Sequence, residues 1–167
     1  NFMEFLQNDL VIVNPLKIKR WIIDELEASM VLYFIGASRS SAAIIDQQKK
    51  NTSSGNEKAI EAMHKIKQSA IDMKQALLKG DMKEFSRILG EGWENKKKMA
   101  DNITNSMIQE VFDLAISAGA VAGKVSGAGG GGFVMLMVEP TRKKELINAL
   151  KKLNGFVMPF HFTEGGA

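Results

Sequence analysis

A run of glycines in the C-terminal third of the chain has the clearest chemical meaning. Residues 124–138 read Lys-Val-Ser-Gly-Ala-Gly-Gly-Gly-Gly-Phe-Val-Met-Leu-Met-Val, and five of the six residues 127–132 are glycine. Glycine has no Cβ, so it tolerates positive φ and lets the backbone approach a ligand closely. Successive exposed N–H groups in such a turn form a site for an anion. Lys124 adds a cation and Ser126 a hydroxyl, and the ligand that we predict is a phosphate.

Two well-known phosphate loops do not fit this segment. The Walker pattern needs a lysine after its glycines, whereas Lys124 comes before them. Gly127, Gly129 and Gly132 have the spacing of the dinucleotide fingerprint, but that fingerprint must open a helix. Residues 133–138 are instead a predicted strand. The remaining alternative is a glycine-rich hairpin with no ligand, which does not require so many glycines.

Hydrophobic periodicity predicts the elements that position this loop. From residue 29 onward we expect a strand, a helical insertion at about residues 42–101, a helix, two strands, a helix and a final strand. Without the insertion, this is the β-α-β-β-α-β order of ferredoxin-like proteins, an α+β fold with an antiparallel sheet. Residues 30–35 and 133–138 are apolar without alternation, which indicates that both faces of the sheet are covered.

Capping and turn residues predict where several elements begin and end. Asp81 is placed to cap a helix, which the glycines of residues 90–92 interrupt. A later helix is capped by Thr104 or Ser106, and the final strand covers residues 156–162.

A second candidate anion site lies in the first half of the chain. Ser38, Arg39, Ser40 and Ser41 come directly before a predicted helix over residues 42–50. A helix N-terminus beside an arginine is a ready anion site. Ordinary capping next to a solvated arginine explains the same residues equally well.

Composition excludes several classes of function. The 167 residues are 45% hydrophobic and 25% charged, an ordinary globular balance. Because cysteine is absent, disulfides, thiolate zinc sites and cysteine nucleophiles are excluded. The net charge of +3 is spread along the chain, so we expect no nucleic acid partner. His64 and His161 lie far apart in sequence, and residues 133–138 are too short to span a bilayer. We expect a cytoplasmic protein without a metal site or membrane partner.

Residues 124–132 resemble the third signature motif of the GHMP kinases, named after galactokinase, homoserine kinase, mevalonate kinase and phosphomevalonate kinase. Three other segments are similar to the branch that phosphorylates D-glycero-D-manno-heptose phosphate. They are residues 35–41 (Ile-Gly-Ala-Ser-Arg-Ser-Ser), 93–98 (Trp-Glu-Asn-Lys-Lys-Lys) and 118–124 (Ala-Gly-Ala-Val-Ala-Gly-Lys). The resemblance implies a sugar kinase that uses ATP to phosphorylate a hydroxyl of a heptose phosphate.

The resemblance also implies roles for individual residues. The transferred phosphate and the sugar acceptor would face Ser126, Gly127, Ala128, Gly129, Gly130 and Gly131. Lys124 would either add a cation to the substrate site or simply lie on the surface. The phosphate already carried by the sugar would be bound by Arg39, Ser40 and Ser41.

The same resemblance implies a longer protein. Residues 1–28 would be the end of an N-terminal kinase domain plus a connecting helix, and residues 29–167 the C-terminal domain. The N-terminal domain would hold most of the ATP and Mg²⁺ site and supply the catalytic aspartate. We therefore assign no catalytic or metal-binding residue in this chain. We expect the chain to fold alone but not to turn over.

Two other functions remain open at this point. One is a different GHMP kinase, acting on galactose, fucose or mevalonate. The other is a non-enzymatic ferredoxin-like module that binds a small ligand or RNA. An RNA-binding sheet would expose aromatic side chains on a recognition strand, whereas residues 133–138 offer one aromatic residue.

Overall fold

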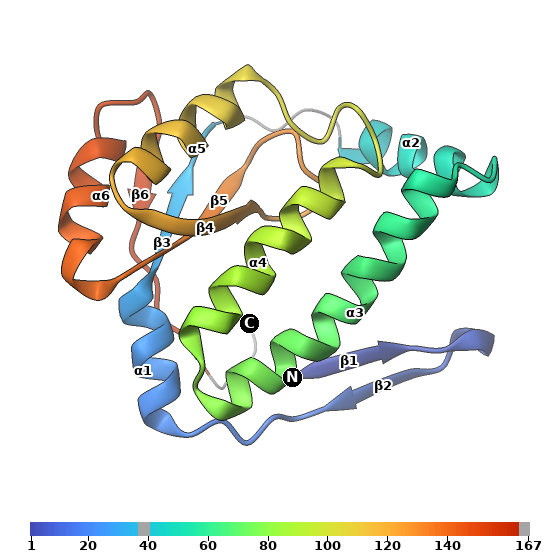
Figure 1. Cartoon of the computed structure of the whole chain (residues 1–167), viewed down its shortest axis with the longest axis horizontal. Helices are drawn as coiled ribbons and strands as arrows, with labels where there is room; N and C mark the ends of the chain where they lie inside the picture. Colours follow the sequence, from blue (N-terminus) through green and yellow to red (C-terminus); the bar gives the residue numbers. More distant parts are fainter. Residues whose placement is uncertain (37–40, 164–167) are drawn as a thin grey trace.

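The computed structural model describes residues 1–36 and 41–163 (Figure 1). The strands are β1 (Phe2–Phe5), β2 (Val11–Asn14), β3 (Met30–Phe34), β4 (Ala120–Val125), β5 (Phe133–Val138) and β6 (Phe156–Met158). The α-helices are α1 (Arg20–Ser29), α2 (Ser41–Ser53), α3 (Glu57–Lys79), α4 (Met82–Lys97), α5 (Ser106–Ser117) and α6 (Lys143–Leu150). Two short 3-10 helices are η1 (Gln7–Asp9) and η2 (Pro140–Arg142).

The main sheet has the order β4-β5-β3-β6, and every neighbouring pair is antiparallel. Along the chain its strands and covering helices follow as β3, α5, β4, β5, α6 and β6, with α2 to α4 inserted after β3. This confirms the predicted ferredoxin-like β-α-β-β-α-β order with a helical insertion.

Helices cover both faces of this sheet, as the unbroken apolar strands predicted. On one face, Tyr33 and Leu136 pack in a cluster with Ile108 of α5 and Leu146 of α6. On the other face, strand residues pack in a second cluster with Phe85 and Leu89 of α4. Figure 1 shows α3 lying along α4, so the insertion forms the outer layer on this side. With both faces covered, the described residues leave no open face of the sheet for RNA bases.

The glycines at residues 90–92 do not interrupt a helix, so that prediction was wrong. Asp81 caps α4 as predicted, its side chain accepting a hydrogen bond from the Glu84 amide at 2.9 Å. The helix then continues through Gly90 and Gly92 to Lys97. A Cβ on Gly90 would lie 3.4 Å from the Cβ of Ala122, so the small residue lets α4 lie close to β4.

The N-cap of α5 is Asn105, not Thr104 or Ser106. Its side-chain oxygen accepts a hydrogen bond from the Ile108 amide at 2.9 Å. All three residues are good caps by type, so the sequence alone did not select among them.

The final strand is also shorter than predicted. β6 pairs with β3 over residues 156–158 only, and Pro159 follows it. Proline has no N–H to donate to a strand ladder, so the pairing ends there. The chain then runs to α1, where the Phe162 amide donates to the carboxylate of Glu27 at 2.6 Å.

The first two strands form a separate hairpin, joined through η1 at residues 7–9. β1 and β2 pair from Phe2 opposite Asn14 to Phe5 opposite Val11. Most of its apolar side chains are exposed, with Phe5 76% exposed. Figure 1 places the hairpin beside α3, where Lys74 lies over the Phe2 ring at 3.9 Å.

Across the described residues, every helix is too short or too polar to cross a membrane.

Candidate phosphate-binding site

The glycine loop, residues 126–132, connects β4 to β5. The Ser126 amide donates to the Phe133 carbonyl at 2.8 Å and closes the base of the loop. Gly127 and Gly129 have φ values of 75° and 112°. A residue with a Cβ is strained at such positive φ values, so the backbone path of the loop depends on glycine.

The segment between α4 and α5 holds the buried side of the loop. The Gly130 amide donates to the Ile103 carbonyl at 2.9 Å, and the Asn105 side-chain amide donates to the Gly130 carbonyl at 3.2 Å. A Cβ on Gly129 would lie 2.7 Å from the Ile103 carbonyl oxygen. The loop is therefore fixed against this segment at a distance that only glycine allows.

Of the other loop amides, those of Gly127 and Ala128 are the more open to a ligand. Within the described part of the chain, no hydrogen bond is donated by the amides of Gly127, Ala128, Gly129 and Gly131. Gly127 is exposed and Ala128 is half-buried, whereas Gly129 and Gly131 are buried. The amides of Ser126 and Gly130, which we also predicted to face a phosphate, already have carbonyl partners. The exposed residue Ser126 still offers its hydroxyl.

Two half-buried lysines stand at the edge of this loop. Lys124 lies on β4, and the Nζ of Lys96, in the last turn of α4, donates a hydrogen bond to the Gly127 carbonyl. Burial lowers the pKa of Lys96, and the positive charge of Lys124 lowers it further. Lys124 is thus at the loop, where we predicted a cation.

Lys96 was missed by the sequence prediction, although it lies in the segment that resembles heptose kinases. Within residues 93–98 three lysines follow one another, and their sequence neighbours do not distinguish them. The contact that distinguishes Lys96 is its hydrogen bond to the carbonyl of Gly127, 31 positions later in the sequence. Trp93, one turn earlier, is buried and stacks on Phe112 at 5.7 Å between ring centroids, which holds this end of α4 against α5.

The second candidate anion site is only partly described. Ser41 begins α2 and is exposed. Arg39 and Ser40 lie outside the described residues.

A metal site would need carboxylates or histidines that lie together. In residues 1–36 and 41–163, no group of three or more such side chains is placed to hold a metal ion. The loop amides and lysines are suited to a phosphate group rather than to a divalent cation.

Comparison with known proteins adds a family to this geometry. The family model described as GHMP kinases C terminal matches residues 73–154, which include Lys96, Lys124 and the whole glycine loop. The chain carries a GHMP kinase C-terminal domain. A mevalonate kinase structure from L. major, 15% identical with a TM-score of 0.73, covers 87% of this chain and shares the GHMP kinase fold.

Two relatives are much more similar in sequence. A Campylobacter jejuni (subsp. jejuni serotype O:2) protein named D-glycero-alpha-D-manno-heptose 7-phosphate kinase is 48% identical over 99% of this chain. A crystal structure of a D-glycero-D-manno-heptose 1-phosphate kinase from Bacteroides thetaiotaomicron is 60% identical over 96% of this chain, with a TM-score of 0.69. The chain spans only 48% of the Campylobacter protein and 41% of the Bacteroides chain.

Proposed function

We propose that this chain is the C-terminal domain of an ATP-dependent sugar kinase that phosphorylates a hydroxyl of a heptose phosphate. The observation that carries the proposal is the glycine loop, in which the amides of Gly127, Ala128, Gly129 and Gly131 donate no hydrogen bond to the described residues. The sequence identity of 48–60% to proteins named heptose phosphate kinases supports the choice of substrate.

Phosphoryl transfer mainly requires groups that position a phosphate and stabilise its charge. Fixed backbone amides do this without reorganising during the reaction, and each hydrogen bond to a charged oxygen contributes roughly 1.5–3 kcal/mol. The amides of the loop and the hydroxyl of Ser126 would bind the transferred phosphate, and Lys124 would add a cation to the substrate site. Arg39, Ser40 and Ser41 remain a proposed site for the phosphate already on the sugar.

The rest of the machinery belongs, in this proposal, to an N-terminal domain. That domain would hold most of the ATP and Mg²⁺ site and supply the catalytic aspartate. The exposed hairpin β1–β2 supports this division, because an isolated two-stranded hairpin is marginally stable in water. We propose that residues 1–28 complete that domain and connect it to residues 29–167, and that the enzyme works in the cytoplasm.

The test is ADP release by the full-length protein with ATP, Mg²⁺ and a panel of acceptors. The panel contains heptose 7-phosphate, heptose 1-phosphate, galactose, fucose and mevalonate. We expect release with a heptose phosphate at least tenfold above that with the other acceptors. Release driven best by galactose, fucose or mevalonate would assign a different GHMP kinase, and release with none of the panel would remove the proposal. The isolated chain is expected to release no ADP.

A further inference from the structure

We infer that Lys96 and Lys124 form a cationic subsite for a phosphate group, with the carbon skeleton of the same ligand lying in the groove between α3 and α4. This inference deepens the proposed function and rests on it for the choice of ligand. It extends the proposed phosphate site by Lys96 and by the groove.

The geometry brings both lysines to one place. Lys96 contacts the carbonyl of exposed Gly127, so its ammonium group lies at the exposed side of the glycine loop. Lys124 is two residues from Ala122 on β4, and Ala122 packs in the cluster formed with α4. Because side chains alternate along a strand, Lys124 points to the same face of the sheet as Ala122.

Both lysines line a groove of about 300 Å³ between α3 and α4. Apart from the two lysines, the residues that form it are mainly apolar: Ile66, Ala70 and Met73 from α3, and Ile88, Leu89 and Trp93 from α4. Small-molecule sites commonly have volumes of about 300–1,000 Å³, apolar walls and a few placed polar groups. The groove has these properties, with its charges at the end next to the glycine loop.

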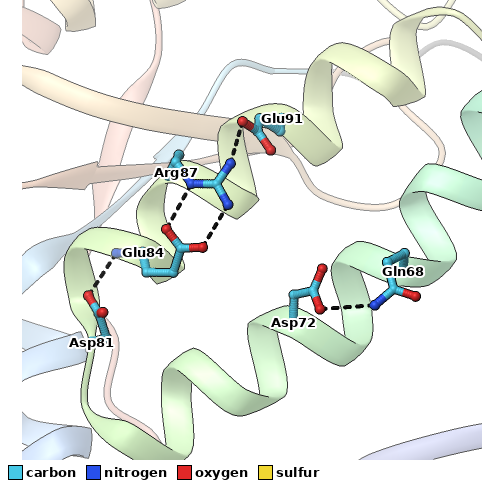
Figure 2. A network of polar contacts seen from close by, with 6 residues as sticks. All are labelled: Gln68, Asp72, Asp81, Glu84, Arg87 and Glu91. Atoms are coloured by element: carbon cyan, nitrogen blue, oxygen red, sulfur yellow. Dashed lines mark hydrogen bonds and ion pairs between the residues drawn. The ribbon is translucent and has the colours of Figure 1, made fainter.

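The charges of the two lysines are not balanced by the described residues. Neither forms an ion pair with a described carboxylate, and the proximity of Lys124 disfavours the charged form of Lys96. Arg87, on the same helix, shows the ordinary arrangement, because Glu84 and Glu91 lie on either side of it (Figure 2). Two half-buried, mutually repelling cations are what a doubly charged phosphate would stabilise.

Two sources of such a phosphate are chemically equivalent: the phosphate that the sugar already carries and a phosphate of ATP. With the sugar phosphate as the ligand, this subsite would take the place of the one proposed at Arg39, Ser40 and Ser41. Separate titrations distinguish the two sources.

The experiment is a calorimetric titration of the full-length protein without turnover. The probes are inorganic phosphate, a heptose phosphate, the same heptose without its phosphate, and a non-hydrolysable ATP analogue. The variants are Lys96→Gln and Lys124→Gln, with Lys96→Arg to restore the charge. Lys98→Gln is the matched control, because Lys98 is exposed and its ammonium group donates to the Asn95 side chain at 3.1 Å rather than to the glycine loop.

We expect each Lys→Gln variant to bind heptose phosphate at least tenfold more weakly. The unphosphorylated heptose should bind equally to all variants, Lys98→Gln should match the wild type, and Lys96→Arg should recover most of the affinity. A loss confined to the ATP analogue would keep the subsite but assign it to the nucleotide. Heptose phosphate, inorganic phosphate and ATP analogue affinities within twofold of wild type in Lys96→Gln would overturn the inference.

These outcomes are separable from those of the activity assay. An enzyme that releases ADP with heptose phosphate while Lys96→Gln binds normally would keep the proposed function and lose the subsite. A protein without activity on the panel, but with lysine-dependent phosphate binding, would lose the proposed function and keep the subsite.

Discussion

Gly129 has no space for a side chain because the backbone of Ile103 lies directly against it. A Cβ at this position would lie 2.7 Å from the Ile103 carbonyl oxygen, and φ is 112°. Gly127 differs, since its φ of 75° is also unusual but no atom lies within 4 Å of a Cβ placed there. The two glycines therefore separate backbone strain from steric contact within one loop.

Replacing each of these glycines by alanine should give different losses of stability. Gly127→Ala should lower the free energy of unfolding by about 1–2 kcal/mol, the strain of an L-residue at positive φ. Gly129→Ala adds the contact with Ile103, and overpacking of this kind costs a further ~1–3 kcal/mol. Urea denaturation monitored by circular dichroism measures both losses. Equal losses in the two variants would contradict the steric argument.

The lysines of the proposed phosphate subsite make a prediction about titration. The positive charge of Lys124 contributes to the lowered pKa of Lys96. Lys124→Gln removes that charge while burial remains, so the pKa of Lys96 should rise but stay below its ordinary value. NMR of ¹³Cε-labelled lysines, with the Lys96 signal assigned from Lys96→Arg, measures this change. Lys98→Gln is the control, and an unchanged Lys96 pKa in Lys124→Gln would show that the charges do not interact.

At the scale of elements, Asn105 joins the start of α5 to the glycine loop. Its Oδ1 accepts from the Ile108 amide at 2.9 Å, and its Nδ2 donates to the Gly130 carbonyl at 3.2 Å. One side chain thus caps a helix and holds a loop 25 residues away. The two roles can be separated, because serine caps a helix about as well as asparagine but has no amide to donate.

We predict that Asn105→Ser and Asn105→Ala differ in stability but not in phosphate binding. The alanine variant should lose about 1 kcal/mol through the missing cap, and the serine variant less than half of that. Both lose the hydrogen bond to Gly130, so inorganic phosphate should bind the full-length protein more weakly, by a similar factor in each. Urea denaturation and calorimetric titration measure the two effects. Wild-type phosphate affinity in Asn105→Ser would argue that the loop holds its shape without Asn105.

The glycines inside α4 lead to a prediction of increased stability, whereas the substitutions described above lower it. Gly92 lies inside the helix, and a Cβ there would have no atom within 4 Å. Gly92→Ala should therefore stabilise the protein by about 0.5–1 kcal/mol through helix propensity. Gly123→Ala is the contrasting variant, because its Cβ would lie 2.8 Å from the Met135 carbonyl oxygen and should destabilise β4. Thermal unfolding of both variants tests the contrast, which fails if Gly92→Ala lowers the midpoint.

At the scale of the whole molecule, the patterns that repeat along the sequence predicted the fold. Periodicity and apolar strands were enough for the sheet, its two covered faces and the place of the glycine loop. Contacts between distant segments were not predictable in this way. The role of Lys96 depends on a bond to Gly127, and the role of Asn105 in holding the loop depends on a bond to Gly130. The early end of β6 could have been predicted, since Pro159 stands in the sequence where the strand stops.

The segment after β6 returns to α1, where residues 161 and 162 contact Glu27. The Phe162 amide donates to Glu27 at 2.6 Å, and Nδ1 of His161 lies 3.1 Å from the same carboxylate. The bond from Phe162, followed by that from His161, holds the pKa of Glu27 below its ordinary value. A carboxylate with a lowered pKa stabilises the folded state above its unfolded pKa, and this contribution is lost as the pH falls through the folded pKa.

Hydrogen exchange at the Phe162 amide should report this contact directly. At neutral pH we expect Glu27→Gln to lower the protection of Phe162, because a hydrogen bond to a charged acceptor is roughly twice as strong as one to a neutral amide. In the wild type, protection should decrease as the pH falls through the Glu27 pKa, after correction for the intrinsic exchange rate, whereas Glu27→Gln should show no such step. Glu25→Gln, an exposed neighbour on α1, is the control. A pH step of equal size in Glu27→Gln would assign the titration to another group and leave the Glu27 contact without a role in holding the C-terminal segment.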